Sequence, residues 1–328
     1  MEQHCPVCNS KDVFKLLAWQ RGFNIYKCKN CLLIYTHPLP SDEELDEFYQ
    51  GFLFRKPDEN KIDRQVEKKK AELAKLFDLH STDDIDNKDF LDFGGGVGLT
   101  TKAARDMGLN AHYFDVDGES VAFLKDKLGI ESEFVFTDVA EIASRKFDFI
   151  LADNVIEHDK CPIEFMRKLY NFLKPDGILV AKTPHACNTE TVFYPAVNLV
   201  GYFLRSLKYN NMKDSIRGYM NRWWHCDPPR HLYSFSEKSF REILKALKIS
   251  DYKIDHYRLG LFRYSIIEFL FSKNKGVKRI IIKILLLIFL PVELMSKLLQ
   301  VFLTSLNLIT PSGLIIKIKK EAVNRQNR

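Results

Sequence analysis

The chain contains no hydrophobic run long enough to cross a membrane. Its most apolar region, residues 280–309, is interrupted by one proline and three charged residues: Lys283, Pro291, Glu293 and Lys297. The longest uncharged piece in the first half of that region, residues 284–292, is far shorter than the ~20 residues that a spanning helix needs. The N-terminus also carries no secretion signal peptide, so we expect a cytoplasmic protein.

The sequence also has little excess charge and no internal repeat. A formal net charge of +6 on 328 residues is modest. The N-terminal region contains acids as well as bases, with few clustered arginines, which argues against a nucleic-acid partner. No long low-complexity tract divides the chain. A chain of this length can form one large domain with a small appendage.

Cysteine is scarce, with seven residues, but four of them form a pattern. Cys5 and Cys8 make one Cys-x-x-Cys knuckle, and Cys28 and Cys31 make a second. This spacing is typical of a structural zinc site with four thiolate ligands. Two disulfides are the alternative, but they would suit a secreted protein. The remaining cysteines are scattered and are interpreted as ordinary small residues: Cys161, Cys187 and Cys226.

Glycine is also scarce, with 15 residues, yet four of them fall within residues 94–98. Apolar residues 90–93 predict a strand before them, and residues 99–107 predict a helix after them. Glycine permits a positive φ and removes the Cβ that would hold a ligand away from the backbone. The motif Asp92-x-Gly94-x-Gly96-x-Gly98 contains an acid, which could meet a cationic amino group rather than a diphosphate. An ordinary tight turn is the alternative interpretation.

Polar residues follow three further apolar strands. Residues 111–114, 133–136 and 147–152 precede, in turn, Asp115, Asp138 and the pair Asp153-Asn154. Because the carboxyl ends of parallel strands meet at one edge of a sheet, we expect these side chains to line one crevice. Asp115 is our candidate for binding a ribose hydroxyl pair. Asp117 competes for that role, unless it caps the following helix.

These segments resemble the class I S-adenosylmethionine-dependent methyltransferases. Residues 92–98 resemble the glycine motif of that family, Asp115 its ribose acid, and Asp138 the acid that commonly meets the adenine amino group. Residues 147–158 look like its fourth strand and Glu-His pair. Residues 173–184 look like its fifth strand and Thr-Pro exit. The sequence departs from the pattern at His185, where we expect asparagine.

The resemblance implies an α/β fold, with a Rossmann-like sheet of seven strands and helices on both faces. The last strand, residues 314–319, would be antiparallel. The implied cofactors are S-adenosylmethionine and, in a small N-terminal ribbon, structural zinc bound by the four paired cysteines. The implied cofactor-binding residues are Asp92, Gly94, Gly96, Gly98, Asp115, Asp138, Asp153 and Asn154.

We predict three consecutive parts: a zinc ribbon over residues 1–40, a helical linker or cap over 41–82, and a methyltransferase domain over 83–328. The ribbon has too little core of its own to fold without metal. The ribbon and linker resemble those of bacterial methyltransferases. The large domain would contain a lid, residues 185–230, which is long and rich in aromatic side chains.

The linker carries two helix signals. Ser41 and Glu44 are spaced as a capping box. Residues 61–79 predict an amphipathic helix whose apolar face is formed by Val66, Leu73, Leu76 and Phe77. We expect this helix to lie beside the sheet and to cover the cofactor crevice.

Three histidines are candidates for a general base. A hydroxyl acceptor would need such a base near neutral pKa, which suits imidazole. His231 has the best context, a proline-stiffened loop that also contains Asp227 and Arg230. His158 and His185 lie just past the fourth and fifth strands. Each could instead cap a helix or bond a carbonyl group.

The hydrophobic helical insertion, residues 277–310, has more than one interpretation. Its basic flank and proline-broken apolar sequence fit a segment at the inner face of a membrane. Burial against the sheet or a homodimer surface is the alternative.

The predicted function is methyl transfer to a small acceptor. The resemblance implies a hydroxyl of a sugar, a nucleotide-linked sugar or a lipid-linked glycan intermediate. A membrane-associated quinone or phenol O-methyltransferase is the second interpretation. From another class, the chain could be a zinc-ribbon nucleic-acid binder or an RNA-modifying protein.

Overall fold

The computed structural model describes residues 3–50, 57–80, 85–194, 202–258, 287 and 289–321. The chain divides into two compact units. The first gathers Met1–Pro40, Pro184–Glu242 and His256–Leu314; the second gathers Ser41–Thr183, Ile243–Asp255 and Ile315–Arg328. Each unit joins segments that are distant in sequence, so the division into consecutive domains stays a prediction.

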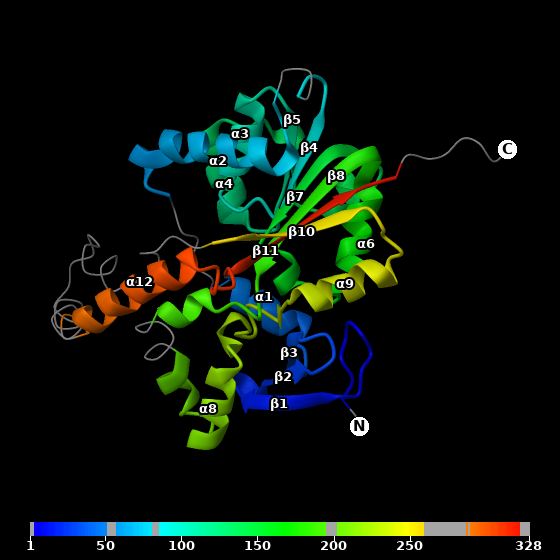
Figure 1. Cartoon of the computed structure of the whole chain (residues 1–328). Helices are drawn as coiled ribbons and strands as arrows, with labels where there is room; N and C mark the ends of the chain where they lie inside the picture. The colour runs from blue at the N-terminus through cyan, green and yellow to red at the C-terminus, as the bar shows by residue number, and fades with distance from the viewer. Residues whose placement is uncertain are drawn as a thin grey trace. The chain divides into compact units, whose positions relative to one another are not determined.

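The second unit contains most of a seven-stranded sheet with the order β10-β11-β8-β7-β4-β5-β6 (Figure 1). Its strands are β4 (Asp89–Phe93), β5 (Asn110–Phe114), β6 (Val135–Phe136), β7 (Phe147–Asp153), β8 (Leu173–Pro184), β10 (Tyr252–Tyr257) and β11 (Gly313–Lys319). The pairs β4–β5, β4–β7, β5–β6 and β7–β8 are parallel. The predicted Rossmann-like sheet with an antiparallel last strand is confirmed.

One predicted strand is shorter than expected. Residues 133–136 were predicted to be extended, but β6 has only two residues and follows the 3-10 turn η3 (Ser132–Phe134). At the edge of the sheet β6 pairs with β5, through Val135 and Phe136.

Helices cover both faces of this sheet. They are α2 (Ile62–Phe77), α3 (Leu99–Asp106), α4 (Gly118–Leu128), α5 (Val139–Ile142) and α6 (Pro162–Phe172), with the 3-10 turns η2 (Glu59–Lys61) and η4 (Ile156–His158). Helix α1 (Asp42–Gln50) begins the second unit, and α9 (Glu237–Ala246) runs from the first unit into the second. On one face Phe90 and Val180 belong to the core formed with α2 and α3. On the other face the ring of Phe93 lies 5.7 Å from that of Phe165 in α6.

Both helix signals of the linker are confirmed. The Ser41 hydroxyl accepts the Glu44 N–H at 3.1 Å, and the Glu44 carboxylate accepts the Ser41 N–H at 2.9 Å. The predicted apolar face of α2 is buried: Val66, Leu73, Leu76 and Phe77.

The first unit contains a four-stranded sheet with the order β1-β2-β3-β9. Three strands come from the N-terminus: β1 (Val13–Ala18), β2 (Asn24–Cys28) and β3 (Ile34–His37), with the turn η1 (Gln20–Gly22) between the first two. The fourth, β9 (Tyr233–Ser234), comes from far along the chain and pairs with β3. Leu16, Trp19 and Ile25 share one core with Ala186 and Trp223. The ribbon strands therefore share their core with distant segments, and the predicted dependence of the ribbon on metal stays a prediction.

The predicted lid contains short helices. They are η5 (Glu190–Phe193), α7 (Leu204–Ser206), α8 (Met212–Met220) and η7 (Trp223–His225); residues 195–201 lie outside the described residues. Some of its aromatic side chains pack within this unit: the Trp223 ring lies 4.5 Å from Trp19 and 5.5 Å from Tyr202.

The described part of the predicted hydrophobic insertion forms α12 (Leu290–Ser305). Residues 277–286 and 288 lie outside the described residues. Among the helices described, none has the length and apolar character needed to span a membrane.

Candidate functional site

The glycine turn between β4 and α3 has the predicted backbone conformation. Gly94, Gly96 and Gly98 have φ of +73°, +51° and +78°, a region that favours glycine because it has no Cβ. The Gly94 N–H donates to the Phe114 carbonyl at 2.8 Å, which ties the turn to the end of β5.

The glycines of this turn have different neighbours. A Cβ on Gly94 would lie 2.5 Å from a methyl group of Val155, and one on Gly98 would lie 2.1 Å from a methyl group of Leu124. Gly95 lies against the ring of Tyr113, whose hydroxyl donates to the Gly96 carbonyl at 2.6 Å. A Cβ on Gly96 would meet nothing within 4 Å. Gly96 is thus the point where bare backbone faces open space.

Asp92 lies beneath this turn and is only 3% exposed. Its Oδ2 accepts the hydroxyl of Thr101 in α3 at 2.8 Å. Burial raises the pKa of Asp92 to about 6, although the Thr101 bond and the charge of Lys69 act in the opposite direction. A cationic partner would stabilise the ionised form of this buried carboxyl group.

Asp115 holds the same turn from the end of β5. Its Oδ2 accepts the Gly96 N–H at 2.7 Å and its Oδ1 accepts the Asp117 N–H at 3.0 Å. Burial raises the pKa of Asp115 above its ordinary value. Asp117 caps α4 by accepting the Ser120 N–H at 3.0 Å. The competing candidate thus takes the capping role, and Asp115 is the acid beside Gly96.

Asp138 is the N-cap of α5. It accepts the Ala140 N–H at 2.8 Å, and Glu141 completes a capping box. Its predicted contact with adenine stays a prediction.

Asp153 ends β7 in an ionic network that the sequence analysis missed. Its Oδ2 lies 2.9 Å from the Lys182 Nζ and 3.5 Å from the Lys69 Nζ. Glu72 bonds the same two lysines at 2.5 and 2.9 Å. Burial alone would raise the pKa of Glu72, but these two cations lower it. The i, i+3 spacing of Lys69 and Glu72 could have indicated a pair on one helix face, but nothing in the sequence indicated their partner strands.

Asn154, the next residue, has φ of +58°. Its amide donates to the Asp153 Oδ1 at 2.8 Å. The neighbouring Glu157 is buried, and its Oε2 accepts the Thr183 hydroxyl at 3.0 Å.

His158 belongs to the second unit, with the glycine turn. Its Nδ1 is 3.1 Å from the hydroxyl of Tyr49 at the end of α1. The sequence did not predict Tyr49 as a site residue, because its contact with His158 joins two segments that are distant in sequence.

The other two candidate histidines belong to the first unit. The His231 Nδ1 is 2.6 Å from the Asp227 Oδ1, and Arg230 bonds the other oxygen of Asp227 at 3.0 Å. Burial alone would raise the pKa of Asp227, but His231 and Arg230 hold it below its ordinary value. His185 is buried, and burial together with nearby His256 lowers its pKa to about 4. His185 is accordingly a poor base near neutral pH.

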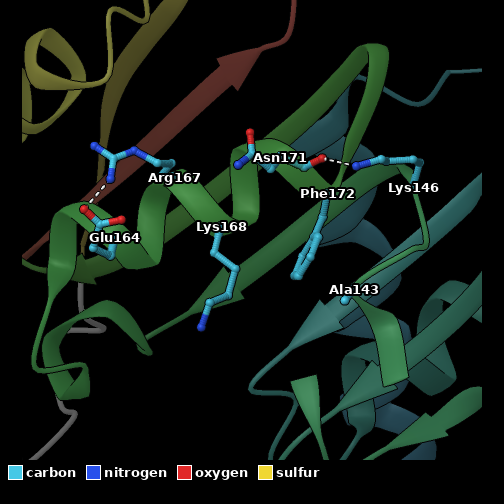
Figure 2. Close-up of a pocket in the computed structure, with 7 residues that line it drawn as sticks. All are labelled: Ala143, Lys146, Glu164, Arg167, Lys168, Asn171 and Phe172. Atoms are coloured by element: carbon cyan, nitrogen blue, oxygen red, sulfur yellow. Dashed lines mark hydrogen bonds and ion pairs between the residues drawn. The ribbon is translucent and has the colours of Figure 1, made fainter. Parts of the chain in front are cut away.

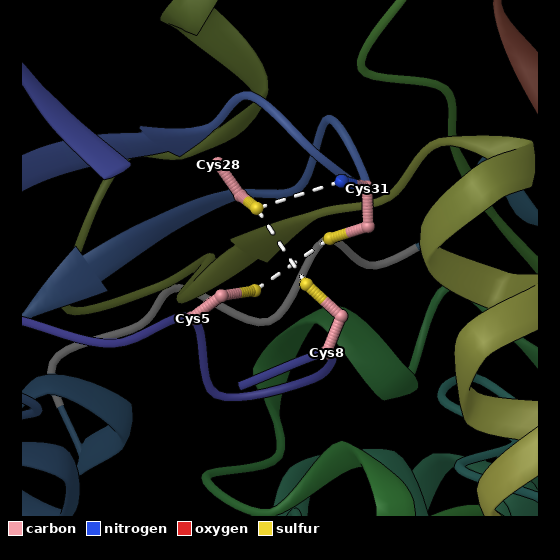
Figure 3. A group of neighbouring side chains, drawn as sticks. All are labelled: Cys5, Cys8, Cys28 and Cys31. Atoms are coloured by element: carbon pink, nitrogen blue, oxygen red, sulfur yellow. Dashed lines mark hydrogen bonds between the residues drawn. The ribbon is translucent and has the colours of Figure 1, made fainter. Parts of the chain in front are cut away.

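The four paired cysteines converge, as Figure 3 shows. Cys5 Sγ lies 3.6 Å from Cys31 Sγ, and Cys8 Sγ lies 3.6 Å from Cys28 Sγ. All four sulfur atoms lie within 4.8 Å of one another. A tetrahedral ion with metal–sulfur bonds of about 2.3 Å requires sulfurs about 3.8 Å apart. The cluster therefore fits a four-coordinate metal.

A separate surface hollow lies over α6 and is open to solvent. Ala143, Lys146, Glu164, Arg167, Lys168, Asn171 and Phe172 line it (Figure 2). It contains none of the predicted site residues, and we assign it no role in the chemistry.

More than half of the chain matches a known enzyme family. Residues 62–247 match the family described as a methyltransferase domain. The chain belongs to this methyltransferase family. The matched region contains the glycine turn, Asp92 and Asp115, and the enzyme is of the class I type that uses S-adenosylmethionine.

Among individual relatives, a ubiquinone biosynthesis O-methyltransferase of Bradyrhizobium diazoefficiens is 32% identical over 97 residues. That match covers 28% of this methyltransferase and 38% of the relative, so the chain spans well under half of the relative's length.

The chain is also similar to solved structures of other methyltransferases. A SAM-dependent methyltransferase from Archaeoglobus fulgidus is 16% identical, with a TM-score of 0.43 over 78% of this chain and 94% of that chain. The plantazolicin methyltransferase BpumL, in complex with a substrate analogue and SAH, is 13% identical, with a TM-score of 0.42 over 86% of this chain and 91% of that chain.

Proposed function

We propose that this methyltransferase transfers the methyl group of S-adenosylmethionine to a hydroxyl group of a small acceptor. The observation that carries the proposal is the bare backbone at Gly96, which faces open space in a turn that contains the buried Asp92 at its start and is bonded by Asp115. When bound, the sulfonium cofactor supplies an electrophilic methyl group.

The chain's own residues would hold the cofactor by complementary charge and hydrogen bonding. Asp92 suits the cationic amino group of the cofactor, because a positive charge stabilises the ionised form of a buried carboxyl group. Asp115 suits the ribose hydroxyls, because both of its oxygens keep acceptor capacity beside their N–H bonds. Asp138, Asp153 and Asn154 complete the proposed set.

His231 is our choice of general base. The bond from its Nδ1 to Asp227 would fix the tautomer that leaves Nε2 as the proton acceptor. Asp227 is itself held by Arg230, so the imidazole is oriented rather than free to rotate. His158 and His185 are the alternative bases, and the low pKa of His185 makes it the weaker of the two.

We infer that zinc is the metal of the cysteine cluster. Four sulfur ligands leave no open coordination position, so the ion would be structural rather than catalytic. Cys28 ends β2, and Cys31 lies just before β3. The metal would therefore stabilise the turn between these strands.

Two chemical classes of methyl acceptor are candidates. The leading candidate is a hydroxyl of a sugar, of a nucleotide-linked sugar or of a lipid-linked glycan intermediate. The second is a phenol or quinone precursor, which is favoured by the similarity to the ubiquinone biosynthesis enzyme. Turnover with sugar hydroxyls but not phenols would support the first, and the reverse would support the second.

His231→Gln should lower turnover at least about 100-fold while cofactor affinity is unchanged.

Calorimetry tests the cofactor site. The intact protein should bind S-adenosylmethionine and S-adenosylhomocysteine, and Gly96→Ala should weaken binding at least about tenfold because its methyl group would occupy the cofactor's space. Gly129→Ala is the matched control: Gly129 also has a positive φ, +67°, and open space around it, but it ends α4 away from the turn. Equal affinity in Gly96→Ala and Gly129→Ala would refute the site.

A further inference from the structure

Helix α12 is oriented with its polar side inward. The residues it buries are Glu293, Lys297 and Gln300, which are 0%, 4% and 2% exposed. Its most exposed side chains are apolar: Val292, Met295, Leu298 and Phe302 are 56%, 71%, 72% and 59% exposed. A helix on the surface of a water-soluble domain has the opposite arrangement.

Specific contacts hold the polar side in place. The Lys297 Nζ donates to the Phe193 carbonyl at 3.1 Å and lies 3.6 Å from the centre of the Tyr194 ring. It also lies 3.8 Å from a Glu293 oxygen and 3.4 Å from the Gln300 side-chain oxygen. The Glu293 and Gln300 contacts lie within α12, whereas the Phe193 and Tyr194 contacts join it to another segment. Rotating α12 to bury its apolar side would break the contacts with Phe193 and Tyr194.

The outward side of α12 carries no charge. Its charged residues, Glu293 and Lys297, are both buried. The apolar surface continues past the end of the helix, where Leu306 and Leu308 are 51% and 64% exposed. A continuous apolar surface of this kind marks a contact with another apolar phase or partner.

The charge of the neighbouring sequence identifies the occupant. Residues 269–292 contain no acid but five basic residues, which are Lys273, Lys275, Lys278, Arg279 and Lys283. Anionic headgroups attract a basic run of this kind, whereas the same run of a second copy offers it no opposite charge. An apolar face next to a run of basic residues is typical of a helix that lies in the membrane interface.

We propose that the apolar face of α12, defined as Val292, Met295, Leu298, Leu299 and Phe302, inserts into the interface of an anionic lipid bilayer. On the buried side, Lys297 and Ser296 attach the helix to the Phe193 carbonyl group. This inference does not depend on the identity of the methyl acceptor.

Vesicle flotation tests the proposal on the full chain. The protein should float with vesicles of phosphatidylcholine and phosphatidylglycerol, and less with phosphatidylcholine alone. The triple variant Met295→Glu/Leu298→Glu/Phe302→Glu should lower the bound fraction at least about tenfold, because each carboxylate must leave water to enter the interface.

A matched control lies on α8. Met212, Ile216 and Met220 are also exposed, at 56%, 48% and 71%, but α8 has charged residues among them. Met212→Glu/Ile216→Glu/Met220→Glu should float as the wild type does. Unchanged cofactor affinity in both triple variants would show that they fold, and would separate this test from the test of methyl transfer.

A second measurement avoids charge substitutions. In the Met295→Trp variant, vesicles containing brominated phosphatidylcholine should quench the fluorescence of the introduced tryptophan. This quenching should be at least about twofold stronger than in Met220→Trp. Absence of wild-type flotation, equal flotation of the two triple variants, or equal quenching at positions 295 and 220 would overturn the proposal. A dimer that only the α12 variant abolishes, without vesicle binding, would assign the face to a second copy instead.

Discussion

At the residue scale, neighbouring glycines of one turn serve different purposes. A Cβ on Gly94, Gly95 or Gly98 would meet the side chain of Val155, Tyr113 or Leu124, respectively, at less than 3 Å, while Gly96 faces open space. The motif predicted the turn, but it could not distinguish a glycine needed for packing from one needed by a ligand. The contacts of each position depend on residues far along the chain.

Asp92 leads to a prediction about pH. Its pKa is raised to about 6, so protonation below that pH removes the negative charge proposed to hold the cationic end of the cofactor. S-adenosylmethionine affinity should fall by about tenfold for each pH unit below the pKa of Asp92 and should be nearly constant above neutrality. Calorimetry in buffers of different pH measures this directly.

Asp92→Asn provides the control. The variant should bind the cofactor weakly, with little change over the same pH range. Because burial also raises the pKa of Asp115, a persistent pH dependence in Asp92→Asn would assign the effect to Asp115 and contradict the prediction.

At the scale of elements, an ionic network joins α2 to β7 and β8. Lys182, only 8% exposed, bridges Glu72 and Asp153. Lys182→Met would leave these two carboxylates with Lys69 as their shared cation, and we expect the free energy of unfolding to fall by about 3 kcal/mol. Urea denaturation measures the change.

Lys174 is a matched comparison. It also bridges two carboxylates, those of Asp89 and Asp148, at 2.6 and 2.7 Å. Its side chain is 34% exposed, so solvent screens the pairs and Lys174→Met should cost about 1 kcal/mol or less. If the two variants lose equal stability, burial is not what makes the α2 network important.

At the scale of the whole molecule, the structural metal should stabilise one compact unit. Trp19 and Trp223 report on the core that contains β1 and β2 of the first unit. Removing the metal with a chelator should lower the melting temperature of their fluorescence by at least about 5 °C, because metal binding contributes folding free energy.

Metal analysis and two cysteine variants check this result. Cys28→Ser should reproduce the loss, Cys161→Ser should not, because Cys161 is exposed and outside the cluster, and added zinc should restore the chelated protein. A metal-free protein with an unchanged melting temperature would show that the shared core suffices without the ion.

The sequence by itself determined the order of strands and helices around the glycine turn, the acids at the strand ends and the four cysteine positions. These signals are local: periodicity, glycine spacing and paired cysteines each depend on a few adjacent residues. Boundaries shifted at β6, where residues 132–134 form a 3-10 turn instead of extending the strand.

Only the tertiary structure decided that β9 completes the ribbon sheet, that Lys182 connects α2 to Asp153, and that α12 turns its polar residues inward. These features join residues separated by many tens of positions, and their energies come from burial and pairing. No local pattern specifies which distant partner a buried lysine or an edge strand will meet.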